Sequence, residues 1–373
     1  MTLAETGAKQ GRLYFLDNLR TFMIFLVVVV HSGLIYESAG YAGTFWIVDD
    51  PVTTDLTGLI NLFLDMFIMS VIFYVSGYLV PRSIASHKGW EFVKTKFKRL
   101  IIPWLVAVFT LMPLYKFIFF YSRGLPQGDW TTYFHFSNGI FSMNWLWFLP
   151  ALFLFHMIYY GLSKIGGLSI NLSLIKAGII TFIFGFVYSY AMSMAGAEGW
   201  TKTPFFDFQN ERIFIYFMMY VLGALSYKLK IFDKLPGKKT LYYIVNSTIW
   251  LPMCTYAIFL LNFFLRPGQY ITSLELDVIL LWFSFHLSIY GILYILVDTF
   301  RFYFNKQGKI GAILNTSSFG VYIIHVIVMG MIATLLLGVG LSAISKYVIL
   351  VLTTFISSTA IVRTYKYSIK KIF

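Results

Sequence analysis

Long apolar stretches recur along the whole chain, and they constrain its fold more than any other feature. Because a helix rises about 1.5 Å per residue, about 20 apolar residues cross a hydrocarbon core of about 30 Å. Ten stretches qualify: 17–36, 56–80, 101–121, 144–163, 173–193, 211–229, 241–264, 275–300, 312–337 and 342–363. They predict an all-α, polytopic transmembrane helix bundle of about ten spans, because helices satisfy their backbone polar groups internally in lipid.

Basic residues are concentrated in alternate connections between these stretches. If the N-terminus is cytoplasmic, 23 of the 29 lysine and arginine residues fall on the cytoplasmic side. The other six are Lys116, Arg123, Lys202, Arg212, Arg266 and Lys346. Since cytoplasmic loops of membrane proteins are enriched in lysine and arginine, we expect both termini to be cytoplasmic.

Composition narrows the functional classes further. The net charge of +13 alone would be compatible with binding to nucleic acid. However, only 12% of residues are charged and the basic ones flank apolar stretches, so no nucleic-acid partner is expected. Cys254 is the single cysteine, which excludes a disulfide or a cysteine metal site within the chain, and we expect no metal. The first stretch lacks a small-residue cleavage site, so it is interpreted as a retained helix.

The first span carries the best candidate for catalysis. Arg20 and His31 are eleven residues apart, which places them within roughly 20° on one helical face and about 16 Å apart along the axis. Asp17 lies near that face. One residue could hold the anionic end of a donor while the other acts deeper in the membrane. Alternatively, Arg20 anchors the helix at the boundary and His31 is a packed histidine.

The ninth span carries a polar stripe of Asn315, Ser318, Tyr322 and His325, at spacings of three and four residues. Such a stripe needs water, a ligand or partners on other helices. It could complete a reaction cavity with His31, or it could join helices by hydrogen bonds. Two further intramembrane carboxyl groups are ambiguous: Asp65 could orient a histidine or lie at the water boundary, and Asp277 shares a face with serines.

A basic segment follows the second span. It runs from Arg82 to Arg99 and is interpreted as a loop, in which Lys98 and Arg99 lead directly to Pro103 at the start of the third span. Cationic side chains there could bind the phosphates of a cytosolic ligand. The alternative is that they orient the protein and bind lipid headgroups.

Several of these motifs resemble those of the acyltransferase-3 family of membrane acyltransferases. Residues 16–20 followed by His31 resemble its opening Arg-x10-His motif, and further similar segments are 74–79, 92–103, 147–149, 217–227 and 319–325. The resemblance spans almost the whole chain in order. It implies a single acyltransferase domain over 1–373, with a core of about 13–364, closest in layout to the glucan succinyltransferase and O-acetyltransferase group. Residues 69–73 depart from the family's Asp-x-Phe-Phe segment.

The resemblance implies transfer of an acyl group, acetyl or succinyl, from cytosolic acyl-CoA to a hydroxyl of a carbohydrate or cell-envelope acceptor. His31 and Arg20 would then be catalytic, with His31 as a base or as an acyl carrier. Substrate would be bound by Asp17, Lys98, Arg99, Trp147, Ser318, Tyr322 and His325. No bound cofactor is expected, since acyl-CoA is a co-substrate.

The same resemblance indicates a multi-pass protein of the plasma or inner membrane. Expected partners are acyl-CoA, the glycan acceptor and membrane lipid, and a homodimer is left open. Two other classes remain: a transporter or flippase for a lipid-linked or anionic solute, which would use the polar stripe as a path, and a structural partner in an envelope assembly.

Overall fold

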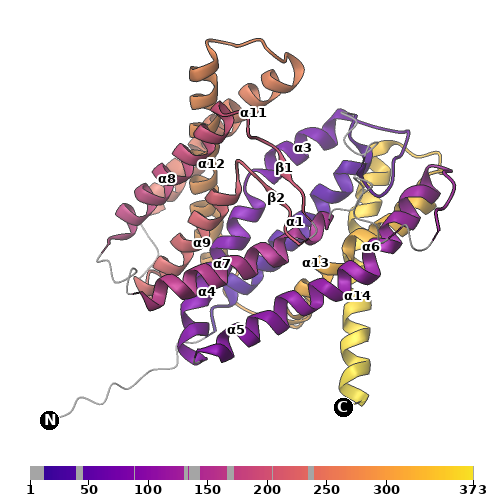
Figure 1. Cartoon of the computed structure of the whole chain (residues 1–373), viewed down its shortest axis with the longest axis horizontal. Helices are drawn as coiled ribbons and strands as arrows, with labels where there is room; N and C mark the ends of the chain where they lie inside the picture. The colour runs from indigo at the N-terminus through magenta and orange to yellow at the C-terminus, as the bar shows by residue number, and fades with distance from the viewer. Residues whose placement is uncertain are drawn as a thin grey trace.

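Helices make up most of the computed structural model (Figure 1). It describes residues 12–38, 45–87, 89–129, 133, 143–165, 172–203, 205–233 and 239–372, with side chains up to 368. Within these ranges nine helical segments are long and apolar enough to span a membrane, and an apolar helix of 16 residues, Ile213–Lys228, is shorter. The chain is therefore a multi-pass membrane protein, as its apolar stretches predict.

The helices follow the predicted order closely. In chain order they are α1 (Tyr14–Tyr36), α3 (Asp55–Asp65), α4 (Ile68–Ser86), α5 (Trp90–Lys96), the π-helix η1 (Phe97–Ile101), α6 (Ile102–Ser122), the 3-10 helix η4 (Asn144–Trp147), α7 (Phe148–Lys164), α8 (Leu174–Met194), α9 (Ile213–Lys228), α10 (Lys239–Thr248), α11 (Trp250–Leu265), α12 (Leu274–Tyr303), α13 (Lys309–Leu336) and α14 (Ala343–Ile372). A hairpin of β1 (Trp200–Thr201) and β2 (Phe208–Gln209) connects α8 with α9.

Most of the basic segment before the third span is helical, because its first residues end α4 at Ser86 and residues 90–99 form α5 and η1, so the interpretation of the whole segment as a loop is wrong. Lys94 and Lys96 lie in α5, and Lys98 and Arg99 lie in η1. The wider π turn stands immediately before Pro103, whose ring nitrogen has no hydrogen to donate to the preceding helical turn. The cationic side chains are therefore presented by a continuous helix of residues 90–122 that also crosses the membrane.

Helices α4 and α9 cross at two glycines that belong to the family-like segments 74–79 and 217–227. A Cβ atom on Gly77 would lie 1.9 Å from the carbonyl oxygen of Tyr220. On Gly223 it would lie 2.1 Å from the carbonyl oxygen of Tyr74. Only glycine permits this backbone approach, which explains why small residues stand at both positions.

Helix α1 is the hub of the bundle, because it packs against α3, α4, α12, α13 and α14 (Figure 1). Its side chains explain this position, since Leu19, Met23 and Val28 are apolar and fully buried. Charged or polar groups on α1 are consequently surrounded by other helices rather than by lipid.

Candidate active site

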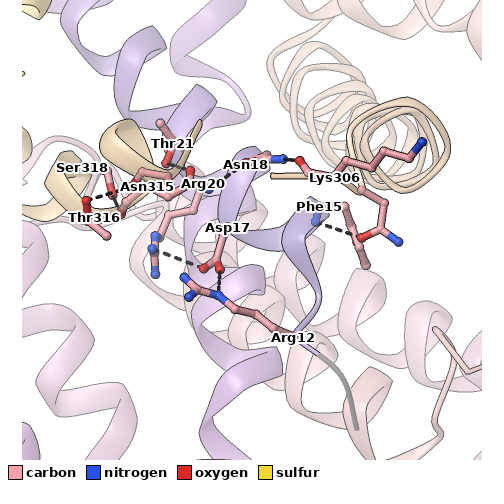
Figure 2. Close-up of polar contacts among 12 residues, drawn as sticks. Arg12, Phe15, Asp17, Asn18, Arg20, Thr21, Lys306, Asn315, Thr316 and Ser318 are labelled. Carbon is pink, nitrogen blue, oxygen red and sulfur yellow. Dashed lines mark hydrogen bonds and ion pairs between the residues drawn. The ribbon is translucent and has the colours of Figure 1, made fainter. Parts of the chain in front are cut away.

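Polar side chains join α1 to α13 near the start of both helices. Asn315 donates to Asn18 Oδ1 at 2.7 Å and accepts from Thr21 Oγ1 at 2.6 Å (Figure 2). Asn18 also donates to the carbonyl oxygens of Phe304 and Lys306, between α12 and α13. These bonds fix how the two helices face each other, and so determine which residues meet farther along the pair.

About three turns farther along, the two candidate histidines are in contact. His31 Nδ1 lies 2.7 Å from His325 Nε2, and the ring planes differ by only 3°. His325 is fully buried, whereas His31 retains some exposure. The structure thus brings together the first-span motif and the end of the ninth-span stripe, which are 294 residues apart in sequence.

Hydrogen-bond partners assign the protons of this histidine pair. His325 Nδ1 lies 2.7 Å from the carbonyl oxygen of Tyr322, which can only accept, so Nδ1 carries the hydrogen. In a neutral ring, Nε2 of His325 then holds a lone pair and accepts from His31 Nδ1. Neutral His31 is left with its lone pair at Nε2, for which no hydrogen-bond partner occurs in the described ranges. The pair therefore presents a base.

A short segment of residues 45–50, between α1 and α3, packs against His31. The Trp46 ring lies 5.0 Å from the His31 ring, and Trp46 Nε1 donates to the His31 carbonyl oxygen at 3.0 Å. Arg123 donates to the Trp46 carbonyl oxygen at 3.0 Å. Asp50 forms an ion pair with Lys346 at 2.8 Å, and both side chains are at most 1% exposed. These contacts hold the segment, and with it the position of the His31 ring.

The other end of α1 carries a cluster of charges. Asp17 bonds Arg12 at 2.7 Å and Arg20 at 3.4 Å, so it lies between the two guanidinium groups (Figure 2). Arg99 on η1 is close enough to Arg20 for the two charges to repel each other. An anion bound here would relieve that repulsion. Arg20, Asp17 and Arg99 are thus brought together as an arrangement suited to phosphate.

A cavity of about 180 Å³ opens beside this cluster. Its polar lining comes from Arg12, Asp17 and Arg82, and its aromatic wall from Tyr78 and Tyr227. The sequence reasoning did not single out Arg12 or Arg82 as site residues. Each residue stands where a predicted span meets the basic side, which is the one signal in the sequence. Only the packing of α1 on α4 places both around one cavity, which Tyr227 of α9 also lines.

Of the remaining predicted site residues, Tyr322, Ser318 and Trp147 contact other parts of the fold. Tyr322 donates its hydroxyl to the Trp145 carbonyl oxygen, and Ser318 donates to the Asn315 carbonyl oxygen at 3.1 Å. Trp147 contacts the rings of Phe73 and Tyr216 rather than the histidines. Lys98 and Arg99 are both exposed on η1. The structure therefore groups His31 with His325 and Arg20 with Asp17 and Arg99, while Trp147 lies apart from both groups.

Among the described residues, the two ambiguous carboxyl groups are bonded to groups other than a histidine. Asp65 forms an ion pair with Arg212 at 2.6 Å and its side chain is 53% exposed, which favours the alternative at the water boundary over the one that orients a histidine. Asp277 accepts the backbone N–H groups of Ile271 and Thr272 at the start of α12. Helix N-termini carry unpaired N–H groups and partial positive charge, so this carboxylate stabilises the end of a helix.

Comparison with known proteins agrees with the motif assignment. A family model described as an acyltransferase domain matches residues 13–363. Proteins named glucans biosynthesis protein C, from Salmonella paratyphi B and Salmonella enteritidis, are 25% identical over 233 residues. The match covers 58% of this chain, and the chain spans 58% of the length of these curated relatives. No solved structure matches the chain.

Proposed function

The chain belongs to the acyltransferase domain family, and from this membership we propose that it is a membrane O-acyltransferase. It transfers an acyl group, acetyl or succinyl, from acyl-CoA to a hydroxyl of a carbohydrate acceptor of the cell envelope. The name of its relatives, glucans biosynthesis protein C, supports a glucan as the acceptor. The observation that carries the proposal is the His31–His325 pair, which leaves a lone pair on His31 Nε2 inside the bundle.

The reaction follows from that lone pair. His31 Nε2 takes the proton of the acceptor hydroxyl, and the oxygen attacks the thioester carbonyl of the donor. The C–S bond breaks, an ester C–O bond forms, and the protonated His31 returns its proton to the thiolate leaving group. His325 accepts the Nδ1 hydrogen bond throughout, so it orients the ring and stabilises the imidazolium. Atoms and charge balance without a further reactant.

Arg20 and its neighbours fit the donor's anionic end. The long, narrow shape of acyl-CoA, with phosphates at one end and the thioester at the other, suits two sites on one helix. Arg20 and His31 are separated by about 16 Å along α1, and Arg12 and Arg82 line the adjoining cavity. We place the phosphates at Arg20, on the cytoplasmic side, and the thioester at His31, with the protein in the plasma or inner membrane.

Release of free CoA by the purified protein tests this function. With acetyl-CoA or succinyl-CoA and a gluco-oligosaccharide, the wild type should release CoA in proportion to the ester formed. Replacing His31 by Gln should lower turnover by about 10² to 10⁴-fold while donor affinity is retained, because only proton transfer is removed. Replacing Arg20 by Ala should instead weaken donor binding.

Expression-normalised turnover separates these outcomes from misfolding. A packing role for both residues would make lost activity track lost thermal stability. If a well-folded His31→Gln protein transfers acyl groups at the wild-type rate, His31 is not the base. Uptake of a solute without CoA release would favour the transporter class instead.

A further inference from the structure

A groove of about 670 Å³ lies between the first part of α13 and the last part of α14. This volume is within the range of about 300–1,000 Å³ that is typical of ligand pockets. The lining on α14 extends from Phe355 to Tyr367, which corresponds to about 18 Å along the helix axis, and Ile313 and Leu314 line the groove from α13. This length is close to the hydrocarbon depth of one leaflet, about half of 30 Å. None of the lining residues belongs to the candidate active site.

One end of the groove is apolar. Phe355 packs on α1, where its ring centre lies 5.1 Å from that of Phe25. Ile356 is 64% exposed and Ala360 is also exposed. The hydroxyl of Thr359 donates to the Phe355 carbonyl oxygen at 2.8 Å, so it makes no demand on a ligand. This end therefore presents a hydrocarbon surface to the membrane, and an acyl chain of a lipid matches it.

The other end of the groove is polar and cationic. It is lined by Arg363, Thr364 and Tyr367. Among the side chains described up to residue 368, none forms a hydrogen bond or ion pair with the side chains of these three residues. Lys366, beside them, donates to the Thr316 carbonyl oxygen on α13. The Arg363 guanidinium is thus a cation in the groove whose counter-ion the described part of the chain does not supply.

The sequence explains why no carboxylate neutralises Arg363 from its own helix or from α13. No aspartate or glutamate follows Asp298, whereas residues 299–373 contain eight lysine and arginine residues. The candidate span of α14 is Ala343–Ser368, so Arg363 is about 7.5 Å from its end, at the depth of lipid headgroups. The last part of α14 extends past the neighbouring helices (Figure 1). The cationic end of the groove therefore meets the membrane surface on the side that we expect to be cytoplasmic.

An anionic phospholipid has the same order of groups as this groove, with a hydrocarbon chain at one end and a phosphate at the other. We infer that the groove between α13 and α14 binds an anionic phospholipid, with an acyl chain along Phe355 and Ala360 and the phosphate at Arg363. A guanidinium forms paired, charge-assisted hydrogen bonds with a phosphate. Basic pockets between transmembrane helices on the cytoplasmic side bind such headgroups. The bound lipid bridges α14 and α13, the helix that carries His325, and the inference does not depend on acyl transfer.

Native mass spectrometry of the full chain in detergent tests the lipid site. The probes are phosphatidylglycerol, which is anionic, and phosphatidylcholine with the same acyl chains, which is zwitterionic. The wild type should bind phosphatidylglycerol more tightly. Arg363→Gln should weaken phosphatidylglycerol binding by about five-fold or more and leave phosphatidylcholine binding unchanged, because it removes one cation at the headgroup. The matched control is Arg266→Gln, an exposed arginine after α11, which should bind both lipids as the wild type does.

A second variant tests the apolar end without a change of charge. Ala360→Trp places a large ring in the groove and should weaken the binding of both lipids. Its control is Val187→Trp on α8, where the side chain is 53% exposed and lies outside the groove, and binding should not change. Thermal melting of each variant verifies that it is folded.

Three results would overturn the proposal. The first is equal affinity of Arg363→Gln and Arg266→Gln for phosphatidylglycerol, and the second is equal affinity of the wild type for the two lipids. The third is a dimer without bound lipid that Ala360→Trp dissociates, since a second copy of the chain would then occupy the groove. Neither acyl-CoA nor an acceptor is present in these measurements, so their failure would leave the proposed function standing.

Discussion

At the scale of single residues, the histidine pair shows how a neighbour determines which nitrogen is chemically active. An isolated histidine in a helix has two tautomers, and each exposes a different nitrogen. Here the Tyr322 carbonyl oxygen determines the tautomer of His325, and His325 determines that of His31. The hydrogen bond to the α13 backbone thus determines, through His325, that Nε2 of His31 on α1 holds the lone pair, and this atom is the proposed base.

This arrangement predicts graded effects at His325. His325→Ala removes the acceptor for His31 Nδ1, so turnover should fall while donor KM stays near the wild-type value. The fall should be smaller than that caused by His31→Gln, because the base itself remains. His325→Gln, whose side-chain oxygen can accept the same hydrogen bond, should restore part of the rate. Steady-state kinetics on stability-matched protein check this, and a donor KM effect without a turnover effect would contradict the orienting role.

At the scale of elements, two features determine how the middle of the chain packs: the crossing of α4 and α9, and the hairpin before α9. The crossing depends on two glycines whose missing side chains allow backbone contact. The hairpin depends on Asp207, which is buried and accepts the N–H groups of Met143 and Thr203. One carboxyl thus connects the residue before η4 with the segment that follows β1.

Gly77→Ala should destabilise the protein by about 1 to 3 kcal/mol or more, because its new methyl group would overlap the Tyr220 carbonyl oxygen. Gly178→Ala on α8 is the matched control, since a Cβ there meets nothing within 4 Å. Thermal unfolding in detergent should show a lower Tm for the first variant and an unchanged or higher Tm for the second. Equal Tm values for both would mean that the crossing is not as tight as the structure indicates.

The hairpin should make stability depend on pH. Burial raises the pKa of Asp207 from 3.8 to about 6, so folding favours the protonated form. The resulting stabilisation is fully present below about 3.8 and is lost as pH rises through about 6. The wild type should therefore lose more Tm between pH 5 and pH 8 than Asp207→Asn, whose amide does not ionise. Parallel pH dependence in the two proteins would remove Asp207 as the cause.

At the scale of the whole molecule, four of the six basic residues outside the cytoplasmic set are engaged in the fold. Arg123 binds the Trp46 carbonyl oxygen, Arg212 binds Asp65, Lys346 binds Asp50, and Lys202 lies 6.0 Å from the Phe45 ring centre. Specific contacts account for these exceptions to the charge bias, so they do not weaken the predicted orientation.

Topology reporters test that orientation directly. Reporters placed after residue 373 and after residue 88 should be cytoplasmic, and one inserted near residue 43 should be on the opposite side, because of the bias of 23 of 29 basic residues. Accessibility to a membrane-impermeant reagent is the measurement. Detection of residues 43 and 88 on the same side would overturn the assignment and, with it, the cytoplasmic position of the proposed donor site.

The sequence by itself determined the class of fold, because a stretch of about 20 apolar residues leaves lipid as its solvent and the helix as its structure. It also placed Arg20 and His31 on one face, since helical periodicity is local. Only the tertiary structure decided which distant groups meet, such as His31 with His325 and Asp65 with Arg212. These pairs depend on how the helices pack against one another. Packing is determined by many contacts at once, so the spacing of residues along one helix does not predict it.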